Sequence, residues 1–183
     1  MSSSLSGVQH VALLRGIGPG NPKMRNPELV RVLTSVGLRD VNAVISSGNY
    51  IFASDERDRS VLEAHIEAAL MDHLGTSCSA IVRSRRQIED LCRLDVFDGR
   101  SDAPTDRCNV TFLQRRPSGS ERLPSGGDGY RVLGVQRSAV FFVVDSTRSK
   151  TPEVMTLMEK VYGKQITTRT WKTVHRIARG FDR

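Results

Sequence analysis

Residues 41–53, VNAVISSGNYIFA, decide the fold because two short apolar runs, 41–45 and 50–53, flank a polar turn. Runs of this length joined through Ser, Gly and Asn are typical of two antiparallel strands in a hairpin. A third apolar run, HVALL at residues 10–14, has the composition of a buried strand. The sequence therefore predicts three strands before residue 54.

Helical periodicity separates these strands. Apolar residues recur at helical spacing between Leu29 and Val36, and Gly37 follows as a stop signal. A second helix is predicted over residues 60–74, followed by a strand over 78–82. The resulting order, strand-helix-strand-strand-helix-strand, is that of the ferredoxin-like fold, an antiparallel sheet with two helices on one face.

The second half is predicted as a looser copy of this plan, so the fold class is α+β with two ferredoxin-like subdomains of mainly antiparallel sheets, residues 1–83 and 84–183. Thr151 is predicted as the N-cap of a helix, with Pro152 at its first position. The other elements predicted here are a helix over 84–94, a helical turn over 117–123, strands over 109–113, 129–135, 138–144 and 165–167, and a final helix over 168–179.

Composition restricts the functional classes. Hydrophobic residues make up 38% and charged residues 26%, as in ordinary globular proteins. No apolar run approaches the roughly 20 residues that cross a bilayer, and the Ser-rich start lacks a signal-peptide core. We therefore expect a cytoplasmic protein that has no membrane partner.

Positive charge is concentrated at the C-terminal end. The chain carries a formal charge of +7, of which residues 148–183, with 9 basic and 3 acidic residues, supply +6. A local excess of this kind attracts anions. The alternative is that a GC-rich genome, which favours Arg codons, produced this excess of positive charge without selection for binding.

Cysteine and histidine spacing favours neither a disulfide framework nor a metal site. Cys78, Cys92 and Cys108 are odd in number and form no Cys-x-x-Cys pair. The four histidines are scattered and none forms a His-x-x-x-His pair. We expect reduced thiols, no metal and no cofactor.

The loop over residues 15–25 is a candidate anion site. It holds Gly16, Gly18 and Gly20 between a strand and a helix start, where backbone N–H groups favour anions. Its spacing matches neither G-x-G-x-x-G, because Asn21 replaces the third Gly, nor the Walker pattern, because no Ser or Thr follows Lys23. A loop shaped only for structure is the alternative.

Two further polar segments have a structural and a functional interpretation. In the turn at residues 46–49, Ser47 and Asn49 either hydrogen-bond a ligand or simply shape the hairpin. Residues 146–150, STRSK, form either a phosphate-holding loop or a structural connection before a helix.

The final predicted helix carries a basic stripe. Its members recur on one face, opposite Trp171, Val174, His175 and Ala178, and they are Arg169, Lys172, Arg176, Arg179 and Arg183. Such a face binds nucleic acid, an acidic partner or a membrane surface, or it is a solvated surface near the chain end.

Three segments together resemble a known bacterial family, the one catalogued as domain of unknown function 1697. They are VALLRGI at residues 11–17, SGNYIF at 47–52 and TTRTWKTV at 167–174. The resemblance implies a cytoplasmic α+β protein of two similar subdomains, and it implies no activity. The family has Asn where this chain has Gly18, Thr170 and Lys172, and its polar signature is matched at Arg15, Lys23, Ser47, Asn49, Lys150, Arg169 and Thr173.

Two functions follow as hypotheses. The first is binding of an anionic or phosphorylated small molecule in a cleft between the subdomains, by Arg15, Asn21, Lys23, Ser47, Asn49, Lys150, Arg169, Thr170 and Thr173. The second is nucleic-acid binding by the final helix through Lys172, Arg176, Arg179 and Arg183, with Tyr50, Phe52, Phe141 and Phe142 as candidate stacking residues. An interaction domain without a ligand is a third. Enzymatic activity, catalytic residues, ligand identity and oligomeric state stay open.

Overall fold

The chain forms two compact units. The computed structural model describes residues 7–18, 20–45, 48–98, 104–119, 121 and 123–183. The first unit consists of Met1–Glu89 together with Arg176–Arg183, and the second of Asp90–His175. The sequence predicts one boundary between residues 83 and 84. The chain instead changes unit within two continuous helices, α3 (Arg85–Cys92) and α5 (Trp171–Gly180), and its last residues rejoin the first unit.

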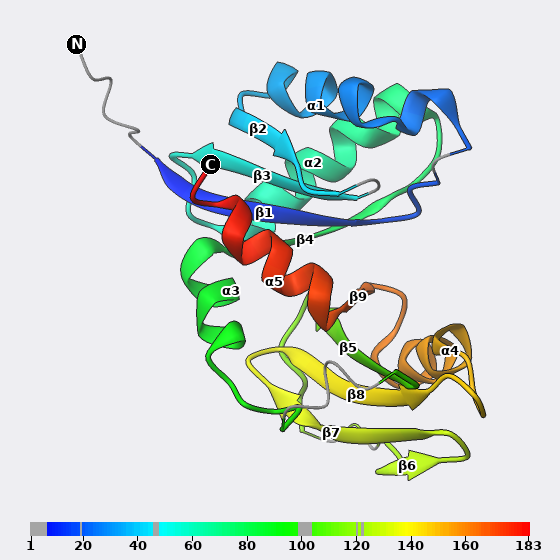
Figure 1. The fold of residues 1–183 in the computed structure, drawn as a ribbon. Coiled ribbons are helices and arrows are strands. Elements are labelled where there is room, and N and C mark those ends of the chain that lie inside the picture. Colours follow the sequence, from blue (N-terminus) through cyan, green and yellow to red (C-terminus); the bar gives the residue numbers. More distant parts are fainter. Residues whose placement is uncertain (1–6, 19, 46–47, 99–103, 120, 122) are drawn as a thin grey trace. The chain divides into compact units, whose positions relative to one another are not determined.

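The first unit is built on a four-stranded antiparallel sheet (Figure 1). Its order is β2-β3-β1-β4, which is the ferredoxin-like arrangement that the sequence predicts. The strands are β1 (Val8–Arg15), β2 (Arg39–Ala43), β3 (Asn49–Ser54) and β4 (Ser79–Ser84).

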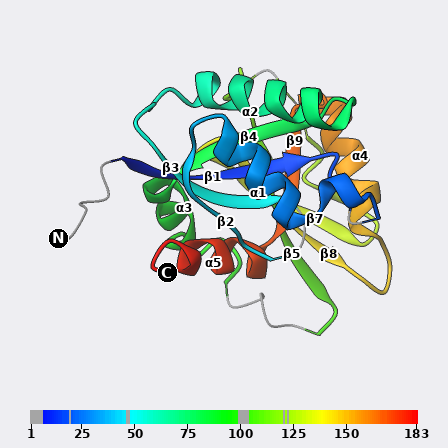
Figure 2. The same ribbon diagram turned by 90° about the horizontal axis from the view of Figure 1, so that it is seen from above.

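Two helices, α1 (Asn26–Ser35) and α2 (Arg59–Leu74), cover one face of this sheet, and the 3-10 turn η1 (Pro22–Met24) precedes them (Figure 2). The Asp58 carboxylate caps α2 by accepting from the N–H of Ser60, and Gly75 ends it with a φ of 68°. The sheet's inward side chains form a core with these helices that includes Ala12, Phe52 and Val82.

His10 is an ionisable group inside this unit. Its ring stacks on Phe52 with centroids 5.4 Å apart, and 2% of the residue is exposed. Among the described residues neither ring nitrogen has a hydrogen-bond partner of normal geometry. Burial lowers the pKa of His10, the backbone of Glu56 raises it by less, and the charge of Arg59 lowers it further.

We predict that His10 makes the first unit lose stability in mild acid. Because its folded-state pKa lies below the unfolded value of 6.5, the unfolded chain takes up the proton first as pH falls. The stabilisation is complete above pH 6.5 and declines below it, by at most about 1.4 kcal/mol per pH unit.

Urea unfolding at pH 7.5 and 5.5 tests this, with the His10→Phe variant as the comparison. The variant keeps an aromatic ring against Phe52 and removes the titration. We expect the wild type to lose more unfolding free energy between the two pH values than the variant does. Equal losses would show that His10 does not contribute.

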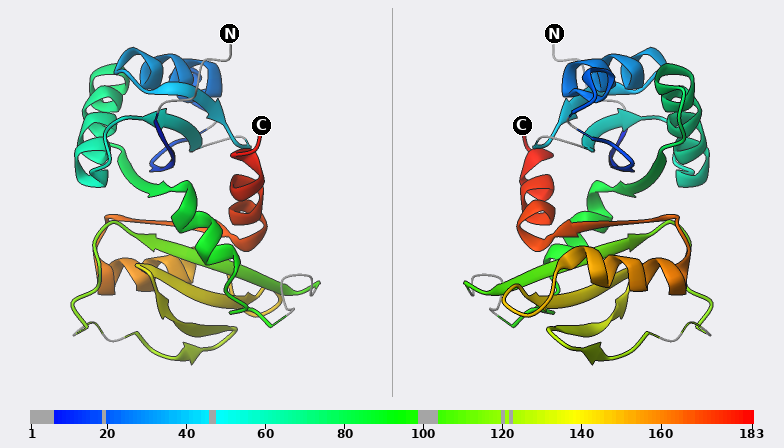
Figure 3. Two further views of the ribbon diagram at one scale, coloured as in Figure 1. Left: turned by 90° about the vertical axis from the view of Figure 1, so that its left-hand side faces the viewer. Right: turned by 90° about the vertical axis from the view of Figure 1, so that its right-hand side faces the viewer.

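The second unit has a five-stranded sheet of order β6-β7-β8-β5-β9 (Figure 3). Without β6 this is again the ferredoxin-like order, and α4 (Thr151–Tyr162) packs on one face through Val154 and Met158. The strands are β5 (Asp106–Leu113), β6 (Gly126–Gly127), β7 (Tyr130–Gln136), β8 (Ala139–Asp145) and β9 (Ile166–Thr170).

Several predicted elements of this half need correction. The described residues between 117 and 123 form no helical turn, and the connection from β5 to β7 contains the short strand β6 where a ferredoxin-like fold has its first helix. Thr151 is the first residue of α4 rather than its N-cap. The N-cap is Lys150, whose side chain makes no capping hydrogen bond.

The final helix begins later than the sequence predicts. Residues 168–170 continue β9, where Arg169 pairs with Val110 of β5, and α5 starts at Trp171. The β-branched threonines at 167, 168 and 170 favour a strand, and this preference outweighs the helical spacing of the basic residues.

Within the described ranges, no helix has both the length and the apolar character that crossing a membrane requires.

Candidate functional site

The last residues of the chain lie against the open face of the first unit's sheet, opposite α1 and α2 (Figure 1). A Cβ on Gly180 would stand 2.8 Å from Cδ1 of Ile51 and 3.1 Å from Cγ2 of Val44, so the end of α5 comes closer to β3 than a side chain would allow. Phe181 follows, is 3% exposed, and accepts a 3.3 Å hydrogen bond at its carbonyl from Nε2 of Gln9.

Arg85 holds this C-terminal segment in place. Its Nη1 donates to Oε1 of Gln9 at 3.0 Å and to the carbonyl of Phe181 at 3.3 Å. Its Nε pairs with Glu89 at 2.6 Å, and Nη2 pairs with Asp182. The guanidinium carbon lies 5.9 Å from the centroid of the Phe181 ring. One arginine therefore connects β1, α3 and the chain end.

A pocket opens between the C-terminal segment and the edge of the sheet formed by β2 and β3. Its volume is about 610 Å³, within the ~300–1,000 Å³ typical of small-molecule sites. We call it the C-terminal pocket, and it is lined by Gly7, Gln9, Asp40, Asn42, Ala43, Val44, Ile45, Ile51, Phe52, Ala53, Arg176, Arg179, Gly180, Phe181 and Arg183.

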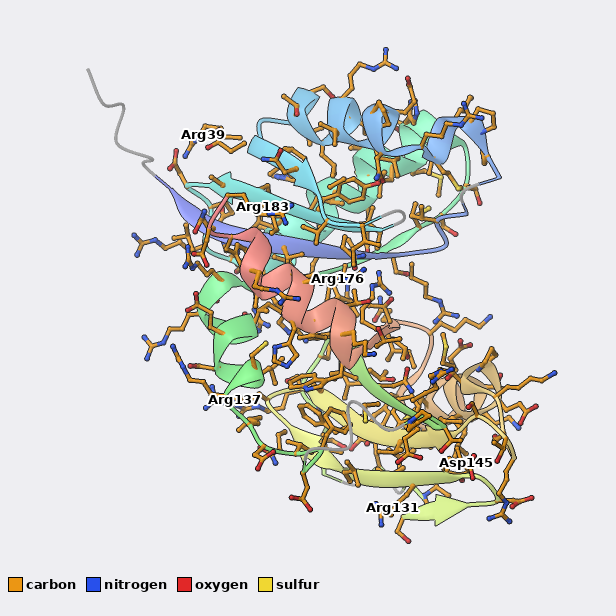
Figure 4. All side chains as sticks on the ribbon, viewed as in Figure 1. Arg39, Arg131, Arg137, Asp145, Arg176 and Arg183 are labelled. Carbon is orange, nitrogen blue, oxygen red and sulfur yellow. The ribbon has the colours of Figure 1, made fainter. Side chains whose placement is uncertain are left out.

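The pocket's charge comes from three exposed arginines, Arg176, Arg179 and Arg183, two of which are labelled on or just after α5 in Figure 4. Among the described residues none of the three side chains forms a hydrogen bond or a salt bridge. The only acidic side chain that lines the pocket within the described chain is that of Asp40. The lining therefore carries a positive excess that the described residues do not neutralise.

Neighbouring arginines in the same unit behave differently. Arg39, near the start of β2 in Figure 4, donates from Nη1 and Nη2 to the two carboxylate oxygens of Asp55 at 2.8 and 2.7 Å. Arg85 is paired with two carboxylates, as described above. The contrast indicates that the arginines of the C-terminal pocket, rather than those beside it, have charge available for a ligand.

The structure gives local roles to most predicted site residues of the first unit. Arg15 ends β1, and the Asn21 side chain caps η1 by accepting from the N–H of Lys23 at 3.0 Å. Asn49 begins β3, is 3% exposed, and donates from Nδ2 to the carbonyl of Val44 at 3.3 Å. None of these residues lines the C-terminal pocket.

Ser47 was predicted with this group and lies outside the described residues.

The predicted site residues of the second unit fall on two sides of its sheet. Arg169 pairs with Val110, whose other neighbour is Phe141, on the face opposite α4. Its Nη1 donates to Oγ1 of Thr167 at 2.7 Å and to the carbonyl of Thr168 at 2.8 Å, and burial lowers its pKa to about 10. It therefore stays charged at neutral pH.

The other predicted residues of this unit lie at helix starts. Lys150 immediately precedes α4. Thr170 Oγ1 accepts from the N–H of Thr173 at 3.3 Å and lies 2.9 Å from its Oγ1, so this pair caps the start of α5. The convergence of the first-unit and second-unit residues on one cleft stays a prediction.

The basic stripe of the predicted final helix is only partly a helical feature. Arg169 belongs to β9 and Arg183 follows the end of α5, which leaves Lys172, Arg176 and Arg179 on the helix. Lys172 is exposed and does not line the C-terminal pocket. The spacing of basic residues in the sequence therefore identified Arg176, Arg179 and Arg183, but it did not indicate that they line one pocket.

Sequence reasoning missed the opposite wall of the pocket and the residue that anchors the chain end. Asp40, Asn42 and Ile45 carry no motif, and Arg85 is one arginine among many. The positive φ of 67° at Ile45, a β-branched residue, is visible only in the structure. Among the described residues, no group of His, Cys, Asp and Glu is arranged to hold a metal ion.

The fold and this pocket define an α+β protein of two ferredoxin-like units with an arginine-lined pocket in the first. The chain belongs to the family described as Protein of unknown function (DUF1697), whose pattern matches residues 8–141. The segment at residues 167–174 that also suggested this family lies beyond the matched span. No protein with a curated description matches the chain.

A solved structure shares the fold. It is the conserved bacterial protein SP0830 from Streptococcus pneumoniae, which is 21% identical. The similarity covers 97% of this chain and 100% of that chain, with a TM-score of 0.70. At this identity the likeness extends to the fold alone.

Proposed function

We propose that the protein binds a phosphorylated or otherwise anionic small molecule in the C-terminal pocket. The observation that carries this proposal is the set of three arginines, Arg176, Arg179 and Arg183, that share one pocket and have no acidic partner among the described residues. The proposal is one of binding, and it assigns no reaction.

Guanidinium groups suit this role. Each presents several N–H donors in a planar fork that matches the oxygens of a phosphate or carboxylate, and the group is charged at any physiological pH. Three such groups around one cavity repel one another when it is empty, so a dianion relieves repulsion as well as forming hydrogen bonds. Asp40 on the opposite wall offsets only part of this charge.

Isothermal titration calorimetry with pyrophosphate tests the proposal. Because a hydrogen bond to a charged group contributes about 1.5–3 kcal/mol, we expect Arg179→Ala to weaken binding roughly 10- to 100-fold. Arg176→Ala and Arg183→Ala should also weaken pyrophosphate binding. The matched control is Arg57→Ala, which removes an exposed arginine of the same unit that does not line the pocket.

The control should bind pyrophosphate as the wild type does. The proposal fails if pyrophosphate does not bind to the wild type at low salt. It also fails if Arg57→Ala weakens binding as much as Arg179→Ala does, because the effect would then be that of net charge alone.

Nucleic-acid binding would use the same arginines together with Lys172. The described structure argues against base stacking, since Tyr50, Phe52, Phe141 and Phe142 are each at most 1% exposed. We therefore favour the small anion. Tight, strongly salt-dependent binding of a mixed-sequence RNA, with no response to pyrophosphate, would reverse this preference.

A further inference from the structure

The wall of the C-terminal pocket that faces the arginines combines Asp40 and Asn42 with an apolar surface. The apolar surface comes from the end of β2, the residues that follow it, and β3. Its members are Ala43, Val44, Ile45, Ile51 and Ala53. A ligand that fills the pocket therefore meets the arginines on one side and, on the other, mainly hydrocarbon beside one carboxylate.

Ile45 is the most exposed part of this wall. The described chain exposes four large apolar side chains, Val36, Ile45, Met71 and Val135, and of these only Ile45 lines the pocket. It is 36% exposed and has a φ of 67°, a conformation that β-branched residues rarely adopt. An exposed isoleucine held in this conformation presents hydrocarbon to whatever occupies the pocket.

The two uncharged polar side chains of the lining, Gln9 and Asn42, are already engaged within the protein. The Gln9 amide donates to the carbonyl of Phe181 and accepts from Arg85, and the Asn42 amide donates to the carbonyl of Asp40. A sugar would find the Asp40 carboxylate as an acceptor, but its hydroxyl groups against Ala43, Val44 and Ile45 would lose water without gaining a hydrogen bond from those side chains. The polyhydroxylated sugar phosphates are therefore poorly matched to this lining.

Stacking of a nucleobase is also poorly supported. The two aromatic residues of the lining, Phe52 and Phe181, are 1% and 3% exposed, so neither offers a ring face. The volume of about 610 Å³ nevertheless exceeds what a bare phosphate fills. The part of the ligand that best fits the rest of the pocket is therefore an aliphatic group.

We infer that the ligand class of this pocket is an organic phosphate with an aliphatic body, its phosphate on Arg176, Arg179 and Arg183 and its chain against Ile45 and Val44. The inference rests on the proposed function, because it assumes that the arginines bind an anion. It adds the chemical class of the rest of the ligand.

A homologous series of n-alkyl phosphates tests the inference by calorimetry. From ethyl to hexyl phosphate we expect affinity to rise roughly fourfold per methylene, the increment for burying one CH₂ group, until the wall is covered. Pentyl phosphate and ribose 5-phosphate have the same number of carbons. We expect pentyl phosphate to bind at least about tenfold more tightly than ribose 5-phosphate does.

Two variants at exposed apolar positions assign the effect to the wall. Ile45→Asn introduces a residue that tolerates positive φ and removes the hydrocarbon, so it should flatten the chain-length dependence and should weaken hexyl phosphate binding more than it weakens pyrophosphate binding. Val36→Asn changes an equally exposed residue outside the pocket and should leave both unchanged.

The outcomes separate the two proposals. Affinity that is independent of chain length, or tighter binding of ribose 5-phosphate, overturns the inference if pyrophosphate still binds and still depends on Arg179. Loss of pyrophosphate binding in the wild type overturns the proposed function and the inference together. A rising series that Ile45→Asn flattens supports both.

Discussion

Replacing Phe181 by Ala is expected to release the C-terminal segment from the first unit and to abolish the pocket. Phe181 is 3% exposed and its ring lies beneath the Arg85 guanidinium, whereas the bonds that its backbone carbonyl accepts from Gln9 and Arg85 do not require the side chain. Truncation of a buried Phe costs about 3–5 kcal/mol. Because the residue is near the end of α5, most of this cost should appear as local undocking rather than global unfolding.

Hydrogen exchange and pyrophosphate titration measure the two consequences. Amides of residues 176–181 should lose protection in Phe181→Ala while those of β1 and β3 keep theirs. Pyrophosphate affinity should fall at least as far as in Arg179→Ala, because all three arginines lose their common position.

The control for this prediction is Phe97→Ala in the second unit. Phe97 is also 3% exposed and packs on Phe141 and Trp171, with centroids 5.9 and 5.1 Å away. That variant should lose stability yet bind pyrophosphate with wild-type affinity. Unchanged protection and affinity in Phe181→Ala would mean that this side chain does not hold the pocket together.

Gly129→Ala is expected to be among the most destabilising single-methyl changes in the second unit. Gly129 has a φ of 72°, and an added Cβ would lie 2.8 Å from the Cβ atoms of Arg148 and Ser149 and 2.9 Å from the backbone nitrogen of Ser149. Positive φ costs Ala about 1–2 kcal/mol, and overpacking against backbone adds about 1–3 kcal/mol. We expect a loss of roughly 2–5 kcal/mol in unfolding free energy.

Gly75→Ala, in the first unit, separates the two contributions. Gly75 has a similar φ of 68° with a ψ of 15°, and its added Cβ would meet nothing within 4 Å. Urea unfolding should therefore give a cost near 1–2 kcal/mol for this variant, from backbone conformation alone. If the two variants lose the same free energy, the close approach of residues 148 and 149 to Gly129 does not exist in solution.

Local chemistry was sufficient to predict the fold of the first unit. The hairpin turn at Gly48, the helical spacing of Leu29 and Leu33, and Gly75 after α2 each act within a few residues, and the ferredoxin-like order follows from their sequence. The second unit was less predictable because its β5–β7 connection lacks a helix among the described residues. The start of α5 was misplaced because Thr168 and Arg169 pair with a distant strand.

The candidate site could be predicted only in part. The spacing of Arg176 and Arg179 is a local pattern and was found. The facing wall depends on β2 and Ile45, more than a hundred residues away in the chain, and on the return of the chain end to the first unit through Arg85. No local sequence pattern indicates that residues 176–183 pack on the first unit. The sequence therefore predicts a basic stripe on a helix rather than one wall of a pocket.

The most direct test of the account is a map of backbone amide shifts in the ¹H–¹⁵N NMR spectrum during titration with pyrophosphate. We predict that the largest changes occur at residues 42–45, 51–53 and 176–183, which surround the C-terminal pocket. Changes concentrated at residues 15–23, 150 and 167–173, with the C-terminal segment unaffected, would contradict the account and would favour the signature residues as the site.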